Sequence, residues 1–123
     1  MHLQRLFKFQ RLQSTMASKT PMTDALRSKI TEALHPTYLE IHNDSHKHQH
    51  HSAMAGNSSL ETHFRVVITS EAFKSKMQPA RHRMVYALMK DELARKGGIH
   101  ALQLKTRTPE EIQEEQNSEV VKQ

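Results

Sequence analysis

The order of hydrophobic and polar positions predicts a helix, a strand and a long loop in the first half of the chain. Apolar side chains at helical spacing predict a helix that begins near Thr20 or Thr23 and ends at His35. Residues 38–42 alternate as a half-buried strand, and residues 43–62 have no periodicity, which predicts a flexible histidine-rich loop. The expected inward positions of the helix and strand are Met22, Leu26, Ile30, Ala33, Leu34, Leu39 and Ile41.

The pattern of apolar and polar residues in the second half of the chain predicts two further strands and three helices. Residues 63–69 alternate as a strand, and Ser70 can cap a short helix that follows. The longest helix is expected over residues 79–95, before Gly97-Gly98, and a third strand over residues 99–106. The expected inward positions of these two elements are Val85, Leu88, Met89 and Leu93, then His100, Leu102, Leu104 and Thr106.

A last helix should begin at the capping-box sequence Thr108-Pro109-Glu110-Glu111 and fray after Gln116. The order is therefore α-β-β-α-α-β-α. It predicts the α+β class, with a three-stranded sheet and helices on one face of it. We expect one domain over residues 20–116, followed by a disordered tail over residues 117–123.

Residues 1–19 have the composition of a mitochondrial presequence. They carry four Lys or Arg residues and several hydroxyl side chains, and no acidic residue precedes Asp24. The alternative is a disordered basic tail. The apolar runs are far shorter than the roughly 20 residues that a membrane span requires, so we expect a soluble chain.

Histidine dominates the candidate chemistry, because the chain has ten His residues and no Cys. Without Cys the chain supplies no thiolate, so soft-metal chemistry must take its sulfur from another molecule. A lone His100 on the apolar face of a strand is usually a hydrogen-bonded core residue. The loop histidines could bind Zn, Ni or Cu unspecifically, or be solvated without function; they are His46, His48, His50 and His51.

Other polar clusters give weaker signals. Asp44, Ser45 and His46 are neighbours on a loop, without the preorganised geometry of a catalytic triad, and we expect no enzymatic turnover. The formal charge is +5, and the basic run 81–83 is either a solvated face or a phosphate site.

Several spaced motifs together resemble the BolA family. The similarity covers about residues 22 to 113, and the basic extension and histidine-bearing loop are most similar to the first mitochondrial BolA-like type of eukaryotes. The motifs are His63-Phe64-Arg65-Val66-Val67, Ser70-Glu71-Ala72-Phe73, Arg81-His82-Arg83-Met84-Val85-Tyr86, and Ile99-His100-Ala101-Leu102 followed by Thr108-Pro109.

The resemblance implies a class II KH-like topology and a role in iron-sulfur cluster assembly or delivery in the mitochondrial matrix. The implied partner is a monothiol glutaredoxin, which shares a [2Fe-2S] cluster through its own thiolate and that of glutathione. Late-acting iron-sulfur targeting factors are further implied partners. The implied ligands from this chain are His100 and, in the loop, His48, with His46, His50 or His51 as alternatives.

A KH-like nucleic-acid-binding transcriptional regulator is the alternative function. Typical KH domains clamp a nucleic-acid backbone with a GXXG loop. That motif is absent here, because the only Gly residues are Gly56, Gly97 and Gly98. We therefore do not expect nucleic acid to be the main partner.

Overall fold

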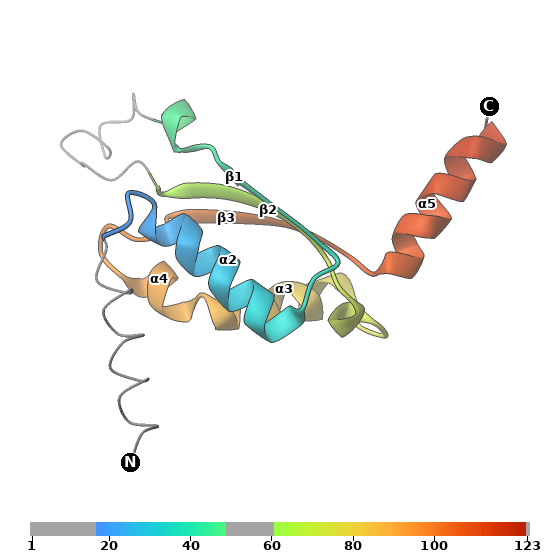
Figure 1. Cartoon of the computed structure of the whole chain (residues 1–123), viewed down its shortest axis with the longest axis horizontal. Coiled ribbons are helices and arrows are strands. Elements are labelled where there is room, and N and C mark those ends of the chain that lie inside the picture. Colours follow the sequence, from blue (N-terminus) through green and yellow to red (C-terminus); the bar gives the residue numbers. More distant parts are fainter. Residues whose placement is uncertain (1–16, 49–60, 123) are drawn as a thin grey trace, which may run out of the picture.

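A computed structural model of the chain describes residues 17–48 and 61–122. Three helices lie on one face of a three-stranded sheet, and a fourth helix extends away from it (Figure 1). This arrangement confirms the expected α+β class. The elements are α2 (Pro21–Leu34), β1 (Tyr38–Asn43), the 3-10 helix η1 (Ser45–His48), β2 (His63–Thr69), the 3-10 helix η3 (Glu71–Phe73), α3 (Gln78–Leu88), α4 (Lys90–Ala94), β3 (Ala101–Arg107) and α5 (Pro109–Lys122).

Helix α2 begins and ends as its sequence predicts. Pro21 occupies its first turn, and His35 ends it in the left-handed conformation with φ of 43°. The side chain of Thr20 caps no helical amide; the carboxylate of Glu61 instead accepts the backbone N–H groups of Met22 and Thr23 at 3.1 and 3.0 Å. Four of the five expected inward residues are buried, whereas Ala33 is exposed.

The sheet has the order β1-β2-β3, with β1 antiparallel and β3 parallel to β2. The parallel pair needs a crossover, which η3, α3 and α4 provide. Alternate residues of each strand face these helices, as the period of two predicts. The largest buried side chains on this face are Phe64, Val66, Ile68 and Leu102, and Leu39 and Ile41 are partly buried against the same core.

The expected helix over residues 79–95 is wrong in one respect, because it breaks at Met89 into α3 and α4. No Pro or Gly marks the break in the sequence. The residue of α4 that is buried is Glu92, only 4% exposed, whose carboxylate accepts from Lys29 Nζ of α2 at 2.8 and 2.9 Å. Burial, the largest single influence, acts to raise the pKa of Glu92, but the hydrogen bond from Lys29, a backbone hydrogen bond and the charges of Lys29 and Arg95 together outweigh it, so the pKa is lowered.

The capping box at the start of α5 is confirmed. Thr108 N donates to Glu111 Oε1 at 2.7 Å, and Glu111 N donates to Thr108 Oγ1 at 3.2 Å. The expected fraying after Gln116 is wrong, because α5 continues to Lys122. Its acidic first turn and terminal lysine both suit the helix dipole, which favours the longer helix.

The expected flexible loop over residues 43–62 is structured at both ends. Asn43 belongs to β1, Ser45–His48 form η1, and Glu61 and Thr62 are buried. Its middle lies outside the described residues, as does most of the expected presequence. No helix in residues 17–48 and 61–122 is long and apolar enough to cross a membrane.

Candidate functional site

The start of the loop that carries the expected histidines and the approach to β3 lie at the same end of the sheet. Because β1 runs antiparallel to β2 and β3 runs parallel to it, the last residue of β1, Asn43, lies near the first residues of the other two strands. These are His63 of β2 and Ala101 of β3, which are register partners. We call this region, from Asn43 to His46 with Thr62, His63 and His100, the histidine end of the sheet.

His100 is exposed and precedes β3, so its expected position on the inward face of the strand is wrong. The backbone N–H groups of His100 and Ala101 both donate to the carbonyl of Thr62, at 2.7 and 3.0 Å. Two residues therefore oppose one, as in a β-bulge, and the inward alternation begins only at Leu102. The consequence is an imidazole that faces solvent while its backbone is fixed.

His63 is the residue at this site that the sequence reasoning missed. Its ring stacks on that of His100, with 5.8 Å between ring centroids and 17° between planes. His63 Nδ1 also lies 2.9 Å from Thr62 Oγ1, within hydrogen-bond distance. The signal was present in the sequence, because a parallel pairing of residues 63–69 with 101–107 places His63 beside Ala101 and hence near His100.

Ser45 joins η1 to the same end of the sheet. Its hydroxyl accepts the backbone N–H groups of Thr62 and His63 at 2.8 and 3.1 Å, and its side chain is also bonded to Asn43 Oδ1. Ser45 is 1% exposed, which makes it a structural residue of this junction.

The bonds of Ser45 fix the start of the segment that carries the loop histidines. His46 is exposed and lies directly after Ser45, and His48 ends η1. His50 and His51 lie outside the described residues.

An ion pair fixes the chain between β1 and η1. Asp44 follows β1 and accepts from Arg65 Nε of β2 at 2.5 Å. The hydrogen bond from Arg65 to Asp44, together with the charge of Asp44, raises the pKa of the Arg65 guanidinium. Asp44 and Ser45 are thus both held by structural contacts at the entry to η1.

The described residues contain no group of three or more His, Cys, Asp or Glu side chains that could hold a metal ion. What the histidine end offers is an exposed imidazole on a fixed backbone, and imidazole is an ordinary ligand of iron and of iron-sulfur clusters. This donor fits a cluster whose sulfur ligands come from another molecule.

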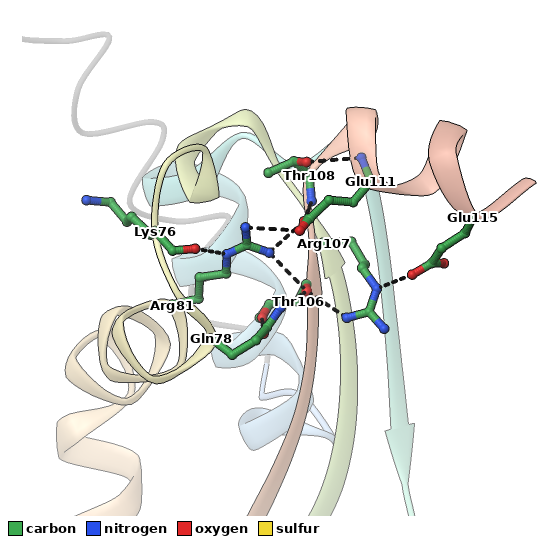
Figure 2. Close-up of polar contacts among 8 residues, drawn as sticks. All are labelled: Lys76, Gln78, Arg81, Thr106, Arg107, Thr108, Glu111 and Glu115. Atoms are coloured by element: carbon green, nitrogen blue, oxygen red, sulfur yellow. Dashed lines mark hydrogen bonds and ion pairs between the residues drawn. The ribbon is translucent and has the colours of Figure 1, made fainter. Parts of the chain in front are cut away.

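The basic run 81–83 does not form an exposed basic face, because Arg81 is buried. It donates to the carbonyl of Lys76 and to the carboxylate of Glu111, each at 2.7 Å (Figure 2). Its guanidinium also lies 5.8 Å from the centroid of the Phe73 ring. Arg81 therefore joins α3 to α5, and the phosphate-site alternative for this run loses its first member.

Comparison with known proteins shows the family. The family model described as BolA-like protein matches residues 30–111. This chain belongs to the BolA family. It is 45% identical over 91 residues to the UV-induced protein uvi31 of Schizosaccharomyces pombe, covering 72% of this chain and 87% of that protein.

Two Arabidopsis thaliana proteins are also similar to this BolA-family chain. SufE-like protein 1, chloroplastic/mitochondrial, is 40% identical over 89 residues, which cover 71% of this chain and 24% of that protein. The solved structure of Arabidopsis BolA1 superposes with a TM-score of 0.63 at 39% identity, covering 72% of this chain and 92% of that one. The α+β fold and the family expected from the sequence are both confirmed.

Proposed function

We propose that this BolA-family protein assists iron-sulfur cluster assembly and delivery by sharing a [2Fe-2S] cluster with a monothiol glutaredoxin. In this proposal His100 and one histidine of the loop supply nitrogen ligands, with His48 as the first loop candidate. The thiolates come from glutaredoxin and glutathione, because this chain has no Cys. The proposed location is the mitochondrial matrix, supported by the basic composition of residues 1–19 and by an Arabidopsis relative named chloroplastic/mitochondrial.

The exposed imidazole of His100 carries this proposal. A ligand that is lent to another protein must reach solvent while its own position is defined. His100 meets both conditions. Its side chain is exposed, and its position is defined because its backbone N–H donates to the Thr62 carbonyl at 2.7 Å and its ring stacks on His63. His63 thereby limits the orientations of the His100 ring before a partner arrives.

The junction at Ser45 also supports the proposal. Its two accepted hydrogen bonds tie the start of η1 to Thr62 and His63, so the segment that carries the loop histidines begins at the same end of the sheet as His100. Two nitrogen ligands from one chain can then approach a shared cluster from the same end of the sheet. Imidazole in place of thiolate raises the potential of a cluster and makes its retention sensitive to protonation, which suits transfer.

The test is the visible absorption and circular dichroism of the full chain mixed with a cluster-loaded monothiol glutaredoxin and glutathione. We expect a spectrum that differs from that of the glutaredoxin alone and that is lost in His100→Ala, while gel filtration still shows the complex. His35→Asn is the matched control, because it removes an exposed imidazole at the opposite end of the sheet and Asn tolerates the left-handed backbone there. A wild-type mixture with an unchanged spectrum refutes shared ligation.

Single alanine variants of the loop identify the second ligand. We expect one of them to lower cluster retention and the other three to leave it unchanged. Equal retention by all four variants would exclude a loop ligand. The variants are His46→Ala, His48→Ala, His50→Ala and His51→Ala.

A further inference from the structure

The sheet has a second face that α2, α3 and α4 do not cover (Figure 1). Side chains at alternate strand positions point to it, and the register aligns them in rows. One row consists of Tyr38, Thr69 and Arg107, and the next consists of Glu40, Val67 and Lys105. Tyr38 on this face is 53% exposed.

A groove of about 410 Å³ lies on this open face, beside the base of α5. Tyr38, Val67, Pro109 and Ile112 give it an apolar lining, and Lys105 stands at its border. No described residue forms an ion pair with Lys105, whereas Arg107 beside it is paired with Glu115 at 2.7 Å. The groove thus combines apolar surface with an unpaired cation.

At its C-terminal end, helix α5 carries exposed apolar and acidic side chains, which are complementary to the apolar lining and the cation of the groove. Its first two turns are held to the body by the ion pairs of Glu111 and Glu115, and beyond them it extends away from the sheet (Figure 1). Val120 and Val121 there are 72% and 85% exposed. The helix contains five glutamates and one lysine. An isolated helix of this length is marginal in water, so its end gains from a packing partner.

We propose that the groove binds the end of α5 from a second copy of this chain, and that the two copies exchange these helices about a twofold axis. Helix α5 has 14 residues and spans about 21 Å, so in an antiparallel pair of these helices the last turn of one can reach the first turn of the other. When the two helices run antiparallel, the end of each meets the base of the other, where the groove lies.

This arrangement gives each group a partner of matching chemistry. Val120 and Val121 of one copy enter the apolar lining of the other, and Glu119 comes to the border where Lys105 stands. The same surface is used on both copies, so the contact closes as a dimer and does not propagate. The proposal is independent of the proposed cluster ligands, because none of them lines the groove.

Sedimentation equilibrium of the full chain over a range of concentrations tests the proposal. We expect a dimer whose dissociation constant rises about tenfold for each valine contact that is lost, hence about a hundredfold for the symmetric Val120→Asp dimer. Circular dichroism should show an unchanged fold, since Val120 is exposed. Ser28→Asp is the control, because it adds the same charge at an exposed position of α2, on the opposite side of the sheet.

A charge exchange makes the test specific to this pairing. Lys105→Glu and Glu119→Lys should each weaken self-association, because each homodimer then contains two like-charged contacts. An equimolar mixture should recover the wild-type dissociation constant, because both contacts of the mixed dimer are again of opposite charge. A chain that is monomeric up to millimolar concentration, or a dimer that Val120→Asp leaves unchanged, overturns the proposal.

Discussion

The ion pair between Arg81 and Glu111 should make the stability of this protein depend on acid pH. Glu111 accepts hydrogen bonds from Arg81 Nη1 and from the backbone N–H of Thr108, both at 2.7 Å (Figure 2). The hydrogen bonds from Arg81 and from Thr108 lower the pKa of Glu111 from 4.5 to about 2. Glu111→Gln removes the charge and leaves one of the two acceptor oxygens, because the other oxygen is replaced by an amide NH2 group.

The direction and size of the effect follow from linkage. Because the pKa of Glu111 in the folded state lies below its unfolded value, the stabilisation is fully present above pH 4.5 and is lost as the pH falls toward 2. Without screening the shift would correspond to about 3 kcal/mol. The Glu111 side chain is 35% exposed, so solvent screening reduces the expected loss in Glu111→Gln at pH 7 to about 1–2 kcal/mol.

Urea unfolding at a series of pH values from 7 to 3 measures this difference. The free energies of unfolding of wild type and Glu111→Gln should converge as the pH falls. Glu114→Gln is the matched control, because Glu114 is an exposed neighbour on the same helix and forms no ion pair with a described residue. A difference that stays constant from pH 7 to 3, or one shared by Glu114→Gln, would show that the Arg81 contact is not its source.

Two further substitutions test contacts that position the fold. Glu61→Ala removes the acceptor for the backbone N–H groups of Met22 and Thr23, and should lower the free energy of unfolding by about 1 kcal/mol in urea titrations, with Glu61→Gln partly restoring it. Gly98→Ala places a Cβ 2.2 Å from the carbonyl oxygen of Glu92, and should lower the melting temperature through an overpacking cost of about 1–3 kcal/mol; a stability equal to wild type would contradict that close approach.

The sequence was sufficient to predict features that depend only on residues close together in the chain. Thr108 and Glu111 form the capping box because their spacing alone satisfies two amides at a helix start. Leu39 and Ile41 face the core because a strand alternates with a period of two. Such features depend on neighbours in the chain, and they were predictable from the sequence.

Features that depend on distant contacts were not predictable in this way. No Pro or Gly marks the break of the long helix at Met89, and the short helix after it places the Glu92 carboxylate against Lys29 of α2. The exposure of His100 also depends on a distant contact, because the backbone N–H groups of His100 and Ala101 share the Thr62 carbonyl. The family motif indicated that His100 matters, whereas strand alternation assigned it to the wrong face.

The two proposed surfaces occupy opposite ends of the sheet, which makes them separable by experiment. The histidine end lies at Asn43 and Ala101, whereas the groove lies around Tyr38 and Arg107, and a strand of seven residues spans about 23 Å between the ends. A glutaredoxin at one end then leaves the other accessible. Lys105→Glu should therefore weaken self-association without changing the spectrum of the shared cluster, and His100→Ala should do the reverse. If Lys105→Glu also abolished the cluster spectrum, the dimer would be part of the cluster site, and the separation of the two surfaces would be refuted.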